Sequence, residues 1–308
     1  MRVLIVGCGY VGLPLAETLA RSGHEVFGLR RTAEADAPLR AAGVTPLHGD
    51  VSRLETLRAL PTGFDWVVHC AATRGGSTAD YEAVYLRGNL NLIEWLAPSP
   101  PKTFVFTSST GVYGQNDGSL VTEDSPTEPA SPTARVLVAA ERALLTAARE
   151  GRLPAVVLRV AGIYGPGRGF WLRQFLSGAA RLEGEGQRVL NMIHRDDLIA
   201  AIVAALERGR AGEVYNVVDD EPVTQREFFA WLAAQTGRPM PPGAPPESPV
   251  ASPRAPTNKR VSNRKLRQQL GWTPRYPTFR EGCAVELARL GEAGGRRPDV
   301  ATGAGPAS

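Results

Sequence analysis

Residues 2–12 read RVLIVGCGYVG, and the amphipathic run LPLAETLARSG follows at residues 13–23. The apolar, β-branched start predicts a buried strand, and the second run predicts a helix directly after it. The glycines between them form a GxGxxG pattern, which lets the backbone turn sharply and approach a pyrophosphate that the helix N–H groups face. This context predicts a dinucleotide site rather than a merely structural glycine turn. Its expected cofactor-binding residues are Gly7, Gly9, Tyr10, Val11 and Gly12.

The first 110 residues continue this alternation of apolar runs and amphipathic segments. The further strand candidates are residues 25–29, 65–70 and 102–109, and the helix candidates include residues 88–96. Such alternation is typical of parallel strands joined by crossover helices, and the nearly all-apolar strands indicate helices on both faces of the sheet. The sequence therefore predicts an α/β fold, a Rossmann-type doubly wound parallel sheet with a small C-terminal substrate lobe.

The rest of the chain suggests how the domains divide. We expect a dinucleotide-binding core over residues 1–164, to which residues 189–214 return, and a small lobe made of residues 165–188 and 215–290. The Pro-rich stretch at 239–256 is interpreted as a loop or lid. Residues 291–308 contain too few apolar side chains to form a core, which predicts a disordered tail.

The composition excludes several classes of protein. With 43% hydrophobic and 21% charged residues, the 308-residue chain has a globular profile, and its formal charge of +4 is scattered rather than gathered in a basic tail. We therefore expect no nucleic-acid partner. No apolar stretch reaches the roughly 18 residues that span a membrane. Cys8, Cys70 and Cys283 stand far apart, which suits neither a disulfide framework nor a metal site and predicts a reducing, cytoplasmic location.

The end of the second predicted strand bears on the choice of cofactor. Dinucleotide folds that prefer NAD carry an acidic residue there, about 20 residues after the glycine turn, to hold the ribose 2′-hydroxyl. This chain has Arg30 and Arg31 instead. Adjacent guanidinium groups suit the 2′-phosphate of NADP, which arginine binds in bidentate fashion. The sequence predicts NADP as the cofactor, with NAD less favoured; two solvated surface arginines are the alternative.

Several motifs further along the chain accumulate in a fixed order. They are Gly49-Asp50-Val51, His69-Cys70-Ala71-Ala72, residues 106–114 (FTSSTGVYG), Leu158-Arg159, residues 163–167 (IYGPG), residues 193–197 (IHRDD), residues 214–217 (VYNV) and residues 262–274. Together with the glycine turn, this series resembles the extended short-chain dehydrogenase/reductases, the NAD(P)-dependent epimerase/dehydratase group. The resemblance runs from residue 1 to about residue 290.

The resemblance implies further cofactor contacts at the ends of the predicted strands. Asp50 and Val51 are expected beside the adenine, Ala71 and Ala72 along the dinucleotide cleft, Thr107 and Ser108 beneath the nicotinamide ribose, and Val160 and Ala161 near the nicotinamide. Ligands of open α/β sheets bind at these strand ends.

The family's catalytic set is only partly present in this chain. The group usually uses a Ser or Thr, a Tyr and a Lys spaced YxxxK on the next helix, and an Asn on an earlier helix. Ser109 stands in the Ser position, whereas Thr133 and Leu137 occupy the Tyr and Lys positions and Tyr85 occupies the Asn position. Thr133 does not ionise near neutral pH, and Leu137 carries no charge. By resemblance, the chain is an atypical member with a degenerate tetrad.

Two functions remain open from the sequence. In the first, an enzyme keeps hydride chemistry with Ser109 and another proton donor, for which Tyr85, Tyr113, Tyr164 or His194 are the candidates. In the second, the protein binds NADP and a partner or metabolite without turnover, as a sensor or interaction module.

The resemblance also suggests a substrate and an assembly. In this group the substrate is often a nucleotide-linked sugar bound between the sheet and the small lobe, where His194, Lys259 and Arg260 are candidate contacts. Members commonly dimerise through the helices that here hold residues 82–96 and 134–149, and the apolar content of these helices allows a homodimer without requiring one.

Overall fold

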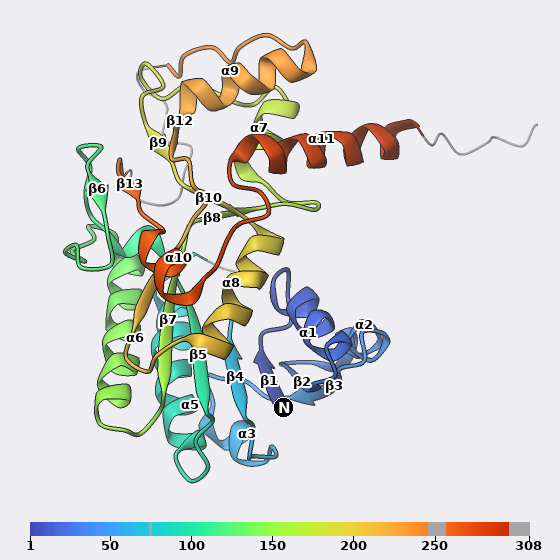
Figure 1. Cartoon of the computed structure of the whole chain (residues 1–308), viewed down its shortest axis with the longest axis vertical. Helices are drawn as coiled ribbons and strands as arrows, with labels where there is room; N and C mark the ends of the chain where they lie inside the picture. Colours follow the sequence, from blue (N-terminus) through green and yellow to red (C-terminus); the bar gives the residue numbers. More distant parts are fainter. Residues whose placement is uncertain (74–75, 246–256, 296–308) are drawn as a thin grey trace, which may run out of the picture.

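A seven-stranded, wholly parallel sheet forms the centre of the protein, whose computed structural model describes residues 1–73, 76–245 and 257–295. The strand order is β11-β7-β5-β4-β1-β2-β3 (Figure 1). The strands are β1 (Arg2–Val6), β2 (Glu25–Arg30), β3 (Thr45–His48), β4 (Trp66–His69), β5 (Thr103–Ser109), β7 (Ala155–Val160) and β11 (Val214–Val217). This order reverses at β1, as in a doubly wound sheet, and confirms the predicted fold class.

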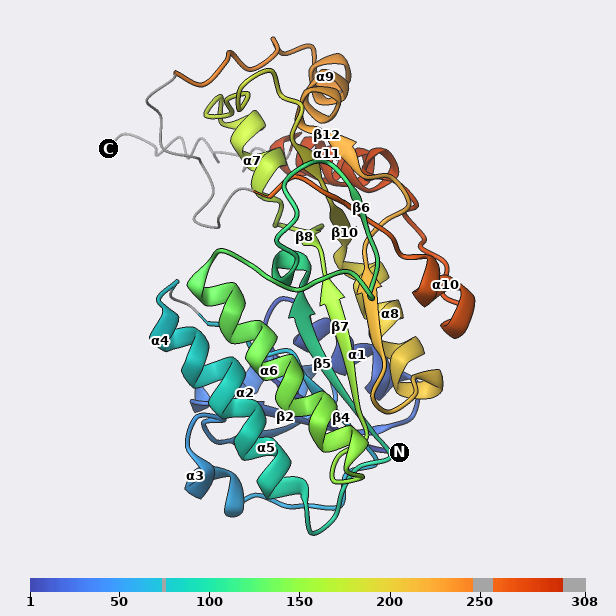
Figure 2. The same cartoon turned by 90° about the vertical axis from the view of Figure 1, so that its left-hand side faces the viewer.

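Helices cover both faces of the sheet, which explains why its inner strands are mostly apolar. On one face lie α4 (Thr78–Tyr81), the π-helical segment η2 (Glu82–Arg87), α5 (Gly88–Leu96) and α6 (Pro132–Arg149) (Figure 2). On the other face lie α1 (Gly12–Arg21) and α8 (Arg195–Arg208). The short α2 (Asp36–Ala41) and α3 (Leu54–Arg58) connect the outer strands.

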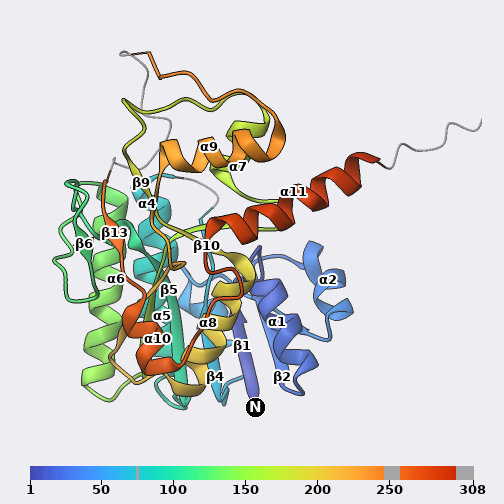
Figure 3. The same ribbon diagram turned by 45° about the horizontal axis from the view of Figure 1, so that its top comes forward.

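A second, smaller apolar cluster lies beyond the carboxyl ends of the strands (Figure 3). It is built from α7 (Phe170–Leu176), α9 (Gln225–Thr236) and α11 (Phe279–Gly295), with the short strand pairs β8 (Gly162–Tyr164) with β10 (Met192–His194) and β9 (Val189–Leu190) with β12 (Val223–Thr224). Phe175, Phe228, Phe229 and Phe279 form its centre. This small lobe sits above the sheet edge where a dinucleotide fold holds its ligand.

The small lobe takes less of the chain than expected from the sequence. β11 is the edge strand of the main sheet, and α10 (Arg264–Leu270) packs against α8 and β11 in the main core. The strand β13 (Arg260–Val261) pairs with β6 (Leu120–Val121), in the loop between β5 and α6. Residues 215–218 and 261–272 therefore contribute to the main core, because Tyr215, Val261 and Trp272 bury their side chains there.

Two segments expected to lack regular structure are partly ordered. α11 continues to Gly295, so residues 291–295 are helical, and the rest of the predicted tail, residues 296–308, lies outside the described part. In the Pro-rich stretch, Pro242 and Ala244 hydrogen-bond through the backbone to Leu182, and residues 246–256 lie outside the described part. Within the residues that the structure describes, no helix is long and apolar enough to cross a membrane.

Candidate functional site

The three glycines of the turn after β1 have different surroundings. Gly7 has φ +96°, and a Cβ there would lie 2.3 Å from the Cα of Ala71. A Cβ on Gly12 would lie 2.1 Å from the Gly7 carbonyl oxygen. At Gly9, by contrast, a Cβ would meet no described atom within 4 Å. Gly7 and Gly12 therefore allow close packing, and Gly9 leaves open space above the turn.

The start of α1 is suited to an anion. Its first turn contains no acidic residue, and no described side chain caps it. The first N–H groups of a helix lack partners within the helix and carry partial positive charge. With open space at Gly9, these groups fit the pyrophosphate of a dinucleotide.

Arg30 lies against the same turn. Its guanidinium donates a hydrogen bond to the carbonyl oxygen of Cys8, and Arg31 beside it is exposed. The next carboxylates along the chain have other partners: Glu34 accepts a hydrogen bond from the Thr32 hydroxyl, and Asp36 pairs with His48 at 2.9 Å. The end of β2 therefore presents guanidinium groups, as the sequence suggested.

The other expected cofactor residues lie at the carboxyl ends of their strands. Asp50 follows β3, and its Oδ1 accepts hydrogen bonds from the backbone and side chain of Ser52. Thr107 donates from Oγ1 to the His69 carbonyl oxygen at 3.3 Å. Val51, Val160 and Ala161 are buried, whereas Ala71 is half-buried and Ala72 is exposed. The structure thus brings these residues to one edge of the sheet.

A buried hydrogen-bond network ties α6 to β5 and β7. Ser108 donates to Glu141 at 2.5 Å, and Arg159 forms an ion pair with the same carboxylate at 2.9 Å. Arg159 also donates to the hydroxyl of Tyr113 at 2.9 Å, and that hydroxyl donates to Asn216 at 2.7 Å. Every charged or polar group in this network has a partner, which makes it a rigid frame.

Two of the expected residues are held inside this frame rather than in a cleft. Ser108 and Tyr113 are buried, and the Tyr113 hydroxyl is already used by two partners. Burial raises the pKa of Tyr113, which keeps its hydroxyl protonated. Tyr113 therefore has the surroundings of a structural residue, because its hydroxyl is buried and already hydrogen-bonded to Asn216 and Arg159.

The same network determines which face of α6 lies against the end of β5. Leu137 and Thr133 lie one and two turns before Glu141, so all three share one helix face. Leu137 is buried in the main core, and Thr133 shares a 2.8 Å hydrogen bond with Ser131. Ser109 follows Ser108 at the end of β5 and accepts a hydrogen bond from the Gly111 N–H at 3.1 Å.

Tyr85 approaches this position from η2, which packs on α6. Its ring centroid lies 5.0 Å from that of Tyr81 and 6.4 Å from that of Phe106 on β5. π-helical turns often occur at functional sites, where they displace a side chain from the regular helix face. The Tyr85 ring thus lies beside Phe106, three residues before Ser109 on β5, and Leu137 supplies no charge on α6.

The expected substrate contacts are spread out. His194 is fully buried, its Nδ1 accepts a hydrogen bond from the Asp196 N–H, and its Nε2 lies 3.6 Å from Glu286. Burial lowers the pKa of His194 and favours the neutral ring. Arg260 is exposed and donates to the Gly118 carbonyl oxygen at 2.7 Å. Tyr164 is also buried. The structure therefore does not gather His194 and Arg260 into one site.

Lys259 is a buried cation. Its Nζ donates to the Tyr113 carbonyl oxygen and to Thr257 Oγ1, both at 2.9 Å. Burial lowers the pKa of Lys259 to about 8. The sequence analysis names Lys259 and Arg260 together as candidate substrate contacts, and the fold shows that Lys259 braces the loop after Ser109.

Two arginines that the sequence analysis left without a role lie beside the glycine turn. The guanidinium carbons of Arg168 and Arg195 stand 5.0 Å and 5.3 Å from the centroid of the Tyr10 ring. These arginines are more than 150 residues from Tyr10 in the sequence, so no local pattern could have paired them.

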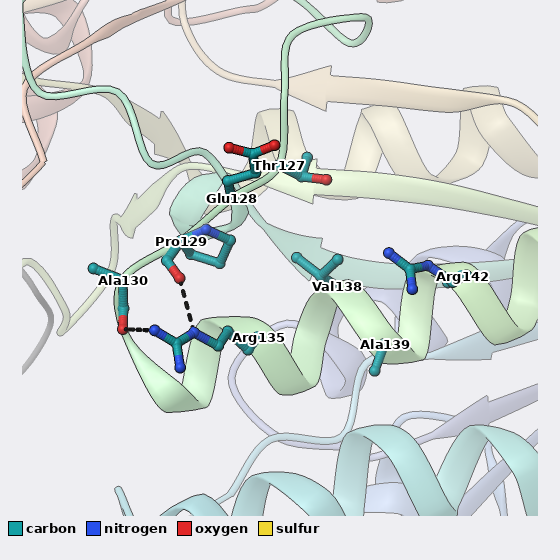
Figure 4. A pocket seen from close by; sticks show the side chains of 8 residues that line it. All are labelled: Thr127, Glu128, Pro129, Ala130, Arg135, Val138, Ala139 and Arg142. Atoms are coloured by element: carbon teal, nitrogen blue, oxygen red, sulfur yellow. Dashed lines mark hydrogen bonds between the residues drawn. The ribbon is translucent and has the colours of Figure 1, made fainter.

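A surface hollow on the outward side of α6 lies apart from all of these residues (Figure 4). Arg135 closes one end by donating to the carbonyl oxygens of Pro129 and Ala130, and Val138 and Ala139 form its floor. The hollow contains none of the expected site residues.

Comparison with known proteins gives consistent relatives. The model of the NAD dependent epimerase/dehydratase family matches residues 3–218. Protein YeeZ of Escherichia coli (strain K12) is 30% identical over 247 residues, which cover 77% of this chain and 84% of YeeZ. A UDP-glucose 4-epimerase of Corynebacterium glutamicum is 29% identical over 318 residues, with 91% and 93% of the two chains covered.

A solved structure resembles the whole fold. DesIV, a dTDP-glucose 4,6-dehydratase from Streptomyces venezuelae with NAD and TYD bound, matches with a TM-score of 0.80 and 25% identity. The match covers 95% of this chain and 97% of DesIV.

Proposed function

Because the chain belongs to the NAD dependent epimerase/dehydratase family of short-chain dehydrogenase/reductases, we propose that it is an NADP-dependent enzyme acting on a carbonyl or sugar-nucleotide type substrate. The observation that carries this proposal is the glycine turn, which is open at Gly9 and has Arg30 rather than a carboxylate against it. The 2′-phosphate of NADP would face Arg30 and Arg31.

The turn and the strand ends are the residues that would hold the cofactor. The N–H groups at the start of α1 would bind its pyrophosphate, and Thr107, Val160 and Ala161 stand where the nicotinamide half would lie. When bound, the nicotinamide accepts or donates a hydride. The protein's own contribution is to orient the substrate and to move a proton.

Ser109 and Tyr85 are the residues we assign to that contribution. The Ser109 hydroxyl would hydrogen-bond the substrate carbonyl or hydroxyl, and the Tyr85 phenol would be the proton donor and acceptor. Leu137 cannot lower the pKa of a neighbouring hydroxyl as a lysine would, and Thr133 cannot replace a tyrosine as an acid. We therefore propose a degenerate tetrad in which chemistry is slower than in members that keep all four residues.

The substrate class rests on the relatives. The Corynebacterium glutamicum relative is a UDP-glucose 4-epimerase, and DesIV is a dTDP-glucose 4,6-dehydratase. A nucleotide-linked sugar would lie between the sheet edge and the small lobe formed by α7, α9 and α11. Of the two predicted contacts, Arg260 is exposed, whereas the fully buried His194 offers no surface to the substrate.

We further propose that the chain forms a homodimer through α5 and α6. Leu90 on α5 exposes 49% of its surface, and the apolar floor of the hollow on α6 lies on the same side of the sheet (Figures 2 and 4). Leu90→Glu should shift the sedimentation coefficient to that of a monomer, whereas the similarly exposed Leu290→Glu on α11 should not.

The alternative is a protein that binds NADP without turnover, as a sensor or interaction module. The apolar side chain of Leu137 in the Lys position favours it. The discriminating experiment is turnover of NADPH or NADP with a panel of sugar nucleotides and carbonyl compounds, comparing Ser109→Ala with the control Ser22→Ala at the far end of α1.

For the enzyme, Ser109→Ala lowers the rate at least about 10-fold and leaves cofactor affinity unchanged, and Ser22→Ala changes neither. An unchanged rate in Ser109→Ala would refute this site. Tight cofactor binding with no turnover of any compound would favour the sensor.

A further inference from the structure

Two guanidinium groups lie over the ring of Tyr10, in the middle of the glycine turn. Arg168 comes from the turn between β8 and α7, and Arg195 comes from the start of α8. Guanidinium groups at 5.0 Å and 5.3 Å from a ring centroid are within cation–π distance. Burial raises the pKa of Tyr10 to about 12, so its phenol stays neutral and does not offset their charge.

The turn that presents Arg168 is fixed against Tyr10. Gly165 and Arg168 exchange two backbone hydrogen bonds of 2.9 Å. Gly165 has φ +135°, and a Cβ on it would lie 3.2 Å from the Tyr10 hydroxyl and 3.1 Å from His194 Nε2. Only glycine suits both this φ and this contact, so the position of the Arg168 turn relative to the glycine turn is built into the fold.

The two arginines differ in their partners. Arg195 forms an ion pair with Asp196 at 3.0 Å. Arg168 is exposed and makes neither an ion pair nor a side-chain hydrogen bond within residues 1–73, 76–245 and 257–295. Arg168 is therefore, like Arg30 on the β2 side of the glycine turn, a positive charge that no described carboxylate neutralises.

We propose that Arg168 binds the pyrophosphate of the dinucleotide cofactor, from the side opposite the N-terminus of α1; this inference rests on the cofactor in the proposed function. Guanidinium and phosphate form charge-assisted, often bidentate hydrogen bonds, and Tyr10 holds the guanidinium beside the turn. Since Arg168 leads directly into α7, cofactor binding would also fix the first helix of the small lobe.

The test is a titration of Arg168→Gln with NADPH and with NADH, following nicotinamide fluorescence at low and moderate salt. The control is Arg173→Gln, an exposed arginine on α7 five residues further on. Both cofactors contain the pyrophosphate, so Arg168→Gln should lower the affinity for NADPH and for NADH by about 10-fold each. The ratio of the two affinities should stay unchanged, and the salt dependence of binding should fall. Arg168→Lys should recover part of the affinity.

Three results would overturn the inference. Unchanged affinity in Arg168→Gln would show that the arginine lies outside the cofactor site. A loss confined to NADPH would place it at the 2′-phosphate instead. An equal loss of affinity in Arg173→Gln would mean that the effect comes from the general surface charge and not from a contact made by Arg168. If the unaltered protein binds neither cofactor, the proposed function fails first, and that outcome is visible before any variant is measured.

Discussion

The hydroxyl of Ser108 donates a 2.5 Å hydrogen bond to the carboxylate of Glu141, and this contact joins the end of β5 to the middle of α6. Ser108 precedes the candidate Ser109, and Glu141 lies on the same helix face as Thr133 and Leu137. The contact therefore joins the strand end that carries Ser109 to the helix face that carries Thr133 and Leu137, the two positions that we predict to replace the Tyr and Lys of the family.

Removal of Glu141 should destabilise the protein strongly. Glu141→Ala leaves Arg159 buried without its partner, which costs about 3–5 kcal/mol in free energy of unfolding. Glu150→Ala, which removes an exposed ion pair with Arg152, should cost less than about 1 kcal/mol. Urea denaturation measures both. Equal losses of unfolding free energy in the two variants would mean that the buried network does not stabilise the packing of α6 on the sheet.

Alanine at Gly9 and alanine at Gly12 should affect different properties of the protein. Gly9→Ala places its Cβ in open space, so the thermal midpoint should stay the same while NADPH affinity falls at least about 10-fold. Gly12→Ala places its Cβ 2.1 Å from the Gly7 carbonyl oxygen and should lower the midpoint by several degrees. Thermal melts and fluorescence titrations of both variants check this. If Gly9→Ala binds NADPH as tightly as the unaltered protein, the open space at Gly9 is not where the cofactor binds.

Arg30→Ala should change the choice of cofactor. Loss of a guanidinium at the 2′-phosphate should lower the affinity for NADPH by about 10-fold and leave the affinity for NADH nearly unchanged. Arg21→Ala, at the end of α1, serves as a control of equal charge. Equal losses for both cofactors would show that Arg30 only supports the turn through its bond to Cys8.

Acid should destabilise the protein through His69. Burial lowers the pKa of His69 to about 4, below its ordinary value of 6.5, so the unfolded chain takes up a proton first as the pH falls. The stability present above pH 6.5 is then lost by about 1.4 kcal/mol per pH unit between pH 6.5 and 4. Urea denaturation at pH 7, 6 and 5 should show a steeper loss in the unaltered protein than in His69→Gln. Parallel curves would contradict this origin.

The sequence was sufficient for the fold and for the family, because both depend on local patterns. The glycine turn, the alternating strands and the ordered motifs are each readable within a few residues, and the parallel sheet and the family match over residues 3–218 confirm them. Contacts between distant residues were not readable. Tyr113 meets Asn216, 103 positions away, and this partner removes it from the exposed proton donors.

The division into lobes shows the same limit. The predicted lobe of residues 215–290 includes most of β11 and all of α10, yet their apolar side chains complete the main core. No local pattern marks Arg168, which directly follows the motif at residues 163–167, because its place beside Tyr10 depends on how the small lobe folds back.

The most direct measurement is a parallel titration of the purified, unaltered protein with NADPH and NADH, following nicotinamide fluorescence. Saturable binding of both, with NADPH clearly tighter, is the result expected from an open glycine turn beside Arg30 and Arg31. Binding of neither cofactor, or a preference for NADH, would contradict the assignment of this chain as an NADP-dependent member of its family.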